Sequence, residues 1–421
     1  MGRKSKFKIN LGLTDINVKN VTIDFNGDYH IHVSCEANSS KCKKCGKTIT
    51  TSYGQCKESI IEHLPILDQK VFIHVKWPRF ICNFCNDNTT SSFHPDWLNK
   101  TGKQTKDYEN YILKCLINST VKDVALKNNT TEDVIDGIIE RKISIETDWN
   151  SISPTALGMD EIALEKGHNR YLTIISDISH KGNVKIIAVL EGRDREAVVP
   201  FLNSIPDRIF KGLEAFCVDM GKGYVSSLKE RMGIELFSKI TVIDRFHVAK
   251  LLGKIIDKER VKEMNVLRKK FENDPDKLET LKNTMWPYRK HWNDLSEEEQ
   301  QKLNQLFSHS FLLSTMYQLR EELYNIFEEK YSVEDAKSKL DKWCELAIFF
   351  EQFHTFVNTI EKHKDTILNY FKGRRSSGPV EGANNKVKVV KRRAFGFRNI
   401  TNFARRLFFD FNFAHEYLAT N

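Results

Sequence analysis

Apolar residues in the middle of the chain fall into short runs that are typical of strands. Five such runs, rich in β-branched residues and separated by Gly, Asp and Asn, lie at 155–164, 169–178, 183–192, 212–224 and 239–248. Between the third and fourth runs, the segment 195–205 has the 3.6-residue period of a helix. We therefore predict an α/β region with the element order β-β-β-α-β-α-β.

Two acidic residues end strands of this region, Asp160 in the first and Asp219 in the fourth. Two divalent cations held close together require carboxylates that converge from separate elements, so this pair predicts a two-metal site. Neighbouring residues of a strand point to opposite faces, so only one of Asp160 and Glu161 can face the ions, and the pattern does not decide which. Asp177, at the end of the second run, could cap a turn or bind an ion.

The N-terminal region contains two Cys-x-x-Cys pairs, Cys42 with Cys45 and Cys82 with Cys85. Two such pairs complete the tetrahedral ligand set of structural Zn²⁺, and reduced cysteines without a metal are the alternative. Between the pairs, the segment 70–77 alternates strictly, so a β-hairpin can return the second pair to the first. We expect His63 and His74 to be strand residues rather than ligands.

A helical region follows, in which 105–117 carries an apolar stripe. Capping-box-like starts at Thr120-x-x-Asp123 and Thr130-x-x-Asp133 predict two short helices joined by a tight turn within 119–143. This shape predicts a helix-turn-helix that enters a major groove, and a plain three-helix bundle or linker is the alternative. Thr131 and Arg141, with Asp136, are the expected base contacts.

From residue 251 to about 370 the strand pattern gives way to helical spacing, and the C-terminal segment that follows is basic. Ser376-Ser377-Gly378-Pro379 predicts a helix start with Glu381 in its first turn. From Gly373 to Asn421 there are ten Lys/Arg against three Asp/Glu, an excess of seven out of the chain's nine. Phosphate contact is the sharper interpretation, and a solvated face over a packed helix is the alternative. The expected contacts are Arg374, Arg375, Asn385, Lys388, Lys391, Arg392, Arg393 and Arg398.

Composition and charge narrow the class of partner. With 65 Lys+Arg against 56 Asp+Glu, the formal net charge is +9, which favours an anionic partner. No run of 18 apolar residues is present and the N-terminus lacks a secretory signal, so we expect a cytoplasmic, nucleoid-associated protein with no membrane partner. Gly46-Lys47-Thr48 resembles the end of a phosphate-binding loop, but Lys41 stands where the first glycine must be, so we expect no nucleotide cofactor.

Four stretches, in this order along the chain, resemble the DDE transposases of bacterial insertion sequences and in particular the ISL-three family: LGMDEIAL with Asp160, CVDMGKGY with Asp219, DRFH at 244–247 and GPVEGANNKVK at 378–388. The resemblance implies an RNase H-like DDE catalytic core with a large all-helical insertion, preceded by a zinc-binding domain and a helix-turn-helix. It selects Asp160 over Glu161. It implies that Asp160, Asp219 and Glu381 bind two Mg²⁺ or Mn²⁺ ions, with Asp244 and His247 as supporting residues.

The expected function is that of an insertion-sequence transposase, which cleaves phosphodiester bonds and transfers strands. The expected partners are double-stranded DNA, both the terminal inverted repeats and the target, and further copies of the chain, because two DNA ends must be held together. The alternatives are a catalytically inactive or domesticated DNA-binding regulator, which would not need all three acids, and a nuclease without strand transfer, which shares the same ions. The expected domains are 1–98 (zinc-binding), 99–150 (helix-turn-helix), 151–250 (first part of the core), 251–370 (helical insertion) and 371–421 (end of the core with its basic helix).

Overall fold

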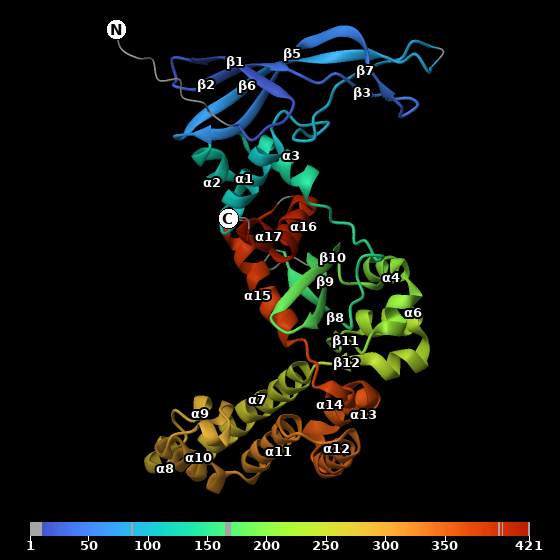
Figure 1. The fold of residues 1–421 in the computed structure, drawn as a ribbon. Coiled ribbons are helices and arrows are strands. Elements are labelled where there is room, and N and C mark those ends of the chain that lie inside the picture. Colours follow the sequence, from blue (N-terminus) through green and yellow to red (C-terminus); the bar gives the residue numbers. More distant parts are fainter. Residues whose placement is uncertain (1–10, 86, 165–169, 395, 398, 420–421) are drawn as a thin grey trace. The chain divides into compact units, whose positions relative to one another are not determined.

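The computed structural model describes residues 11–85, 87–164, 170–394, 396–397 and 399–419 (Figure 1). The chain forms two compact units, one from 1–144 together with 391–421 and the other from 145–390. The chain therefore leaves the first unit once and returns to it near its C-terminus. Arg398, a predicted phosphate contact, lies outside the described residues.

The first unit is built around a sheet with the strand order β1-β2-β6-β5, to which β7 is added beside β6. Its strands are β1 (Ile16–Ile23), β2 (Tyr29–Cys35), β5 (Thr51–Ile66), β6 (Gln69–Ile81) and β7 (Thr90–Ser92). β2 and β6 are parallel, whereas β5 and β6 form an antiparallel hairpin. Leu67 and Asp68 in its turn both have positive φ, as a two-residue hairpin turn that follows the twist of the strands requires.

One face of this sheet is buried because apolar residues alternate along β6. Val71, Ile73, Val75 and Trp77 are all buried, which confirms the prediction from the alternating segment 70–77. They pack with residues of β2, including Ile31. A second, two-stranded sheet of β3 (Ser40–Lys41) and β4 (Thr48–Ile49) precedes the hairpin.

Three helices follow in the region predicted to be a helix-turn-helix: α1 (Lys106–Leu116), α2 (Val121–Lys127) and α3 (Glu132–Lys142). The hydroxyls of Thr105, Thr120 and Thr131 cap their first turns, so Thr131, and not the predicted Thr130, begins α3. The C-terminal elements α16 (Ile400–Phe408), η3 (Phe409–Phe413) and α17 (Ala414–Ala419) also belong to this unit. Arg406 of α16 donates to the carbonyl of Leu116 at 2.9 Å, which ties these elements to α1.

The second unit contains a five-stranded sheet with the strand order β10-β9-β8-β11-β12. Its elements are β8 (Ala156–Ala163), β9 (Tyr171–His180), β10 (Asn183–Glu191), α4 (Arg195–Ser204), α5 (Asp207–Gly212), β11 (Ala215–Val218), α6 (Lys222–Ile240) and β12 (Thr241–Ile243). β8, β9 and β10 are antiparallel neighbours, whereas β11 is parallel to both β8 and β12. The predicted element order is confirmed except for a second helix, α5, between β10 and β11. The fifth run ends as a strand at Ile243 because a helix begins at Arg245.

Different helices cover the two faces of this sheet. Leu157 and Met159 of β8 pack with α4, α5 and α6 on one face. Ala156 of β8 and Cys217 of β11 point to the other face and pack with the helices that follow β12. The sheet is therefore enclosed by helices on both sides (Figure 1).

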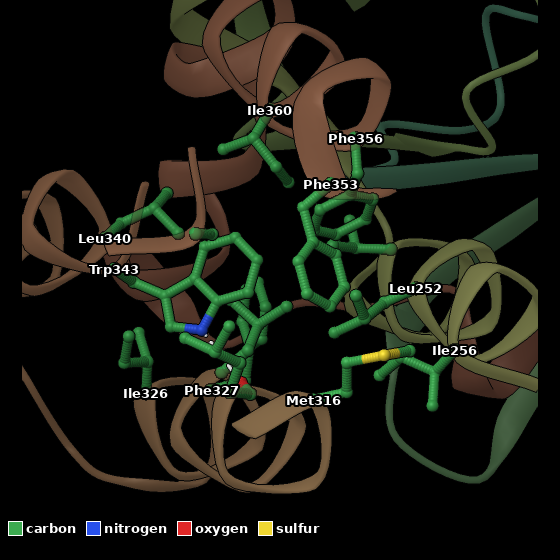
Figure 2. Packing of buried hydrophobic residues seen from close by; sticks show 14 of the residues in the cluster. Leu252, Ile256, Met316, Ile326, Phe327, Leu340, Trp343, Phe353, Phe356 and Ile360 are labelled. Carbon is green, nitrogen blue, oxygen red and sulfur yellow. Dashed lines mark hydrogen bonds between the residues drawn. The ribbon is translucent and has the colours of Figure 1, made fainter. Parts of the chain in front are cut away.

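The segment after β12 is helical, as the spacing of its apolar residues predicted: α7 (Arg245–Lys270), α8 (Pro275–Thr280), α9 (Met285–Arg289), η1 (Trp292–Asp294), α10 (Glu297–His309), α11 (Phe311–Glu328), α12 (Val333–Ala347), η2 (Glu351–Phe353), α13 (His354–Leu368) and α14 (Tyr370–Gly373). Figure 2 shows Trp343 in the core of this helical block, beside Phe353 and Phe356. Trp343 donates its indole N–H to the carbonyl of Leu319 at 2.8 Å, so it serves packing rather than base stacking. Among the helices of the described residues, none is long and apolar enough to span a membrane.

Candidate active site and metal centres

Four cysteines converge in the first unit. The Sγ atoms of Cys42, Cys45, Cys82 and Cys85 all lie within 4.8 Å of one another. Cys42 and Cys85 are 3.8 Å apart, and Cys45 and Cys82 are 3.7 Å apart. The β3–β4 turn presents the first pair and the segment after β6 presents the second. Four thiolates are the ligand set of a closed structural zinc site, so the cluster is compatible with bound zinc.

The backbone favours ionisation of one of these thiols. The amide groups of Cys45 and Lys44 lower the pKa of the Cys42 thiol to about 6. Desolvation and the neighbouring thiols raise the pKa of the Cys85 thiol. Each thiolate disfavours the next one, so only a cation lets all four ionise together. The donor set therefore fits a cation of the zinc type.

The two predicted catalytic aspartates lie on neighbouring strands of the second unit. β8 and β11 are parallel with Met159 beside Val218, so Asp160 of β8 lies beside Asp219, which directly follows β11. By alternation, both lie on the face covered by the helical block. The amide of Gly221 donates to Oδ1 of Asp219 at 2.7 Å, and a Cβ at Gly221 would lie only 2.7 Å from that oxygen. An added Cβ at Gly221 would thus displace the Asp219 carboxylate from the position in which the Gly221 amide holds it.

Helix α15 (Gly378–Arg393) packs on the same face and contacts Asp160. Val380 is fully buried and occupies the space beside Gly158, where an added Cβ would come within 2.3 Å of its Cγ2 atom. One turn later, Nδ2 of Asn384 donates to Oδ2 of Asp160 at 2.6 Å. The helix is therefore docked on β8 through its apolar stripe, with Asn384 directed at the aspartate.

Asn384 is not among the residues predicted from the sequence, which include its exposed neighbour Asn385. Asn384 is buried and lies between Val380 and Val387 on the apolar face of the helix. A polar residue within an apolar stripe is the signal that could have identified it, because a buried amide needs a hydrogen-bonding partner.

Glu381 lies in the first turn of α15 and is exposed. Residues three apart are neighbours on a helix surface, so Glu381 adjoins Asn384 and its contact with Asp160. Glu381 also lines a cavity of about 750 Å³, together with Asp244 and residues of α7 and α11. Among the described residues, Asp160, Asp219 and Glu381 do not form a group whose ligand atoms all lie within 4.8 Å. The convergence of Glu381 on the two aspartates thus stays a prediction.

Asp244 connects the end of β12 to the start of α15. Its side chain is buried, and one oxygen accepts the amide of Phe246 at 2.9 Å and so caps α7. The other oxygen accepts the amide of Ser377 at 3.1 Å as well as the Ser377 hydroxyl. Asp244 therefore fixes the residue at which α15 begins.

The electrostatic environment singles out Asp160. Burial raises the pKa of its carboxyl group, and the charges of Asp219 and Glu161 raise it further, against the Glu161 amide and the His247 charge, which lower it. His247, in the first turn of α7, is thus close enough to act on Asp160. Two neighbouring carboxylates resist joint ionisation unless a cation compensates them, so this site fits a divalent ion.

Glu161 and Asp177, the other acids considered as ion ligands, have partners elsewhere. Glu161 points away from Asp160 and pairs with Arg193 at 3.0 Å, whose guanidinium lies over the ring of Tyr171. Asp177 lies within β9, rather than at its end as predicted, and accepts the amide of Ser179 at 2.9 Å. Asp160 and Asp219 are therefore the strand acids on the face that α15 covers.

A comparison with known protein families identifies the family to which the chain belongs. The model of the ISL-three family, described as a transposase, matches residues 157–407, which is more than half of the chain and includes Asp160, Asp219 and Glu381. The chain belongs to the ISL-three transposase family. Membership implies DNA binding, DNA cleavage and strand transfer.

Curated relatives agree with this assignment. The transposase for insertion sequence element IS1001 of Bordetella parapertussis is 27% identical over 374 residues, which cover 87% of this chain and 85% of that protein. The transposase for IS1557 of Mycobacterium tuberculosis is 24% identical over 266 residues, covering 58% and 57%. A Lactococcus lactis protein named as an ATP-dependent protease is 40% identical over 57 residues, but this covers only 14% of the chain.

Two residues predicted to contact bases have partners within the first unit of the transposase. Arg141 pairs with the fully buried Glu109 at 2.8 Å and so joins α3 to α1. Thr131 accepts the amide of Val134 as the N-cap of α3. These contacts hold α3 in place, and a role of either residue in base contact stays a prediction.

Two arginines before α15 also make internal contacts. Arg374 has a left-handed backbone with φ 50°. Its guanidinium donates to the carbonyls of Phe327 and Glu329 at 3.0 and 2.7 Å and so caps the C-terminal end of α11. Arg375 pairs with Glu214 at 2.5 Å. Both guanidinium groups thus have partners within the second unit, and their contact with DNA stays a prediction.

The last turn of α15 is basic, with Lys391, Arg392 and Arg393 in succession. Arg393 donates to Asn118 at 3.4 Å, whereas Asn385 and Lys388 lie on exposed positions earlier in the helix. The last turn of α15 thus carries a cluster of basic side chains, and their contact with phosphates stays a prediction.

Proposed function

We propose that this transposase binds the terminal inverted repeats of its insertion sequence and catalyses Mg²⁺-dependent cleavage and strand transfer, with Asp160, Asp219 and Glu381 as metal ligands. The observation that carries the proposal is the position of Asp160 in β8 beside Asp219, which directly follows the parallel strand β11, on the face where the helix that carries Glu381 packs. Convergence of the Glu381 carboxylate on these two would complete a ligand set drawn from three separate elements.

Neighbouring residues support this assignment because they orient the carboxylates or set the position of the helix that carries Glu381. Asn384 orients the Asp160 carboxylate through its hydrogen bond, and the Gly221 amide does the same for Asp219. Asp244 sets the start of α15 and hence the position of Glu381 along the sheet. When bound, two Mg²⁺ or Mn²⁺ ions would activate the attacking water or 3′-hydroxyl and stabilise the leaving oxygen.

We infer that this core is RNase H-like. Three antiparallel strands continued by two parallel ones, in the order β10-β9-β8-β11-β12, support the inference, as do the acids that end β11 and lie near the end of β8. The helices from α7 to α14 would then be the insertion between the fifth strand and the last acid.

We further propose that the regions 1–98 and 99–150 recognise the element ends, with the cysteine cluster holding structural Zn²⁺. Lys388, Lys391, Arg392 and Arg393 would contact phosphates and set affinity and its salt dependence rather than sequence choice. Because two DNA ends must be joined, the active species would be a homo-oligomer of at least two chains.

The experiment is to incubate the purified protein with labelled element-end DNA and Mg²⁺ and to map the 3′ ends produced. Asp219→Asn removes a metal ligand but leaves the fold, so cleavage should fall by roughly 10³-fold or more, since a bound metal contributes several kcal/mol to the transition state. Binding to the DNA ends should be retained. Asp177→Asn is the matched control and should cleave like the unmodified protein. Undiminished cutting by Asp219→Asn would refute the assignment.

A further inference from the structure

Histidines gather on the sheet face of the first unit that lies opposite its apolar core. His30 and His32 of β2 alternate with the buried Ile31, and His74 of β6 lies between the buried Ile73 and Val75. β2 and β6 are parallel with His32 directly beside His74. Paired residues on neighbouring strands share a face, so the two imidazoles are adjacent.

A carboxylate of the third strand completes this group. Ile60 of β5 pairs with His74, and Glu58, two residues away on the same face, lies diagonally across from it. One ring nitrogen each of His32 and His74 and one oxygen of Glu58 all lie within 4.8 Å of one another. Nδ1 of His74 is 3.3 Å from Oε2 of Glu58, and the rings of His32 and His74 stack with centroids 4.5 Å apart.

These separations suit a common cation. Two nitrogen ligands at about 2.0–2.1 Å from a tetrahedral zinc ion lie roughly 3.3 Å from each other. Small side-chain rotations would therefore bring the three ligand atoms onto one ion. Two imidazoles and one carboxylate suit Zn²⁺, Co²⁺ or Ni²⁺ better than Mg²⁺, which prefers oxygen ligands and water.

A second observation, independent of the ligand group, is the pair of residues behind His74. Nδ1 of His30 lies 2.9 Å from Nε2 of His74, and Nε2 of His30 lies 3.7 Å from Oδ2 of Asp24. If His74 used Nδ1 for a cation, its one proton would be on Nε2 and would be donated to His30, whose own proton would face Asp24. A carboxylate linked to the far nitrogen of a ligating histidine fixes its tautomer and raises its basicity.

We propose that His32, His74 and Glu58 form a second transition-metal site in this transposase, for Zn²⁺ or a cation of similar chemistry, and that His30 and Asp24 position His74. The site is separate from the cysteine cluster. A cation here would link β2, β5 and β6, three strands that no covalent cross-link joins, on the solvent side of the sheet. His74 would then be a ligand as well as the strand residue that its alternation predicted.

The test uses the full-length protein without a histidine tag, with zinc retained at the cysteines and excess Mg²⁺ present to occupy the carboxylate site. Co²⁺ is titrated in and followed by calorimetry and visible absorption. We expect one further Co²⁺ per chain, with weak ligand-field bands and without thiolate charge-transfer absorption. His32→Gln and His74→Gln should each abolish this equivalent, and Asp24→Asn should weaken it about 10–100-fold.

Two further variants keep the proposal falsifiable. Glu58→Gln preserves shape at an exposed position and should weaken Co²⁺ binding at least about 10-fold even if a histidine variant fails to fold. His180→Gln, an exposed histidine of β9, is the matched control and should bind Co²⁺ like the unmodified protein. The proposal is overturned if the unmodified protein takes up no Co²⁺ beyond the cysteine site, or if Glu58→Gln and the folded histidine variants bind it with unchanged affinity. In that case the histidines form a hydrogen-bonded network only.

Discussion

The cysteine cluster and the proposed carboxylate site of this transposase differ in how the chain brings their side chains together. The four thiols come from two tight turns joined by one hairpin, and their sulfur atoms lie within 4.8 Å of one another. The carboxylates come from β8, β11 and α15, and among the described residues they do not reach that closeness. Local turns thus bring the four thiols together by themselves, whereas the proposed catalytic site depends on how one distant helix docks on the sheet.

Removal of the metal at the cysteines is expected to have the largest effect. Structural zinc binding supplies about 10–16 kcal/mol in small zinc domains, so chelation or Cys82→Ser should unfold the cysteine turns and abolish specific binding to element ends. Bound zinc, thiolate charge transfer after Co²⁺ substitution, and thermal melting are the measurements.

Cys56→Ser is the matched control, because Cys56 lies in the same hairpin but outside the cluster. It should keep its thiolate-bound metal. Unchanged DNA binding and melting after loss of the cysteine-bound metal would contradict a structural role for zinc.

Glu381→Gln tests whether the distant helix supplies a ligand. Cleavage should fall by roughly 10³-fold, because the neutral amide is a poor ligand for a hard cation. Rates of strand cleavage at saturating Mg²⁺ are the measurement, and Glu322→Gln, an exposed acid of α11, should have no effect. Cleavage at the normal rate would show that Glu381 does not join the two aspartates.

Gly158→Ala tests the docking itself. The added methyl group would meet Cγ2 of Val380 at 2.3 Å, so α15 must shift. A displacement of about 1 Å at a catalytic group costs on the order of 10²-fold in rate. Cleavage should fall by that amount, while metal at the cysteines stays unchanged.

The double variant Gly158→Ala with Val380→Ala removes the clashing atoms and should restore part of the rate. Gly212→Ala, where an added Cβ meets nothing within 4 Å, is the control and should cleave normally. Equal cleavage rates for Gly158→Ala and Gly212→Ala would show that the packing of α15 on β8 does not set the catalytic geometry.

The smallest expected effect is on stability, in the variant Asp160→Asn. Burial and the charge of Asp219 raise the pKa of Asp160 above its value in the unfolded chain. At a pH between these two pKa values the folded protein binds more protons than the unfolded chain does. The stability of the fold therefore falls as the pH rises from the unfolded pKa through the folded pKa. In Mg²⁺-free buffer at neutral pH, Asp160→Asn should melt at a higher temperature than the unmodified protein.

The difference in melting temperature should shrink as pH falls through the raised pKa, and also when Mg²⁺ is added. Thermal melting over a pH series, with zinc retained, is the measurement. A variant that is less stable than the unmodified protein at every pH would show that the Asp160 carboxylate is not electrostatically disfavoured in the folded state.

Much of the fold followed from the sequence because its signals are local. Alternation identified β6, and the apolar runs gave the element order of the second sheet. The Cys-x-x-Cys spacing was enough to bring Cys42 and Cys85 together. In each case the residues that decide the structure lie within one element or one hairpin.

The missed features depend on packing between distant segments. Asn384 meets Asp160 across more than 200 residues, and no local pattern in the sequence states which face of α15 will meet β8. The partners of Arg374 and Arg141 are likewise set by helix packing, so a basic residue that looked available for DNA in the sequence has an internal bond in the structure. The histidine group on β2 and β6 could not be foreseen because no pattern within either strand states that they pair in parallel with His32 beside His74.

The hydrogen bond from Ser377 to Asp244 joins the two ends of the long helical segment between β12 and α15. The chain enters and leaves that segment at two residues that touch, so β12 and α15 are held together whatever the number of helices that do not pack on the sheet. Relatives could therefore differ in length among those outer helices and keep the same spacing between β12 and α15.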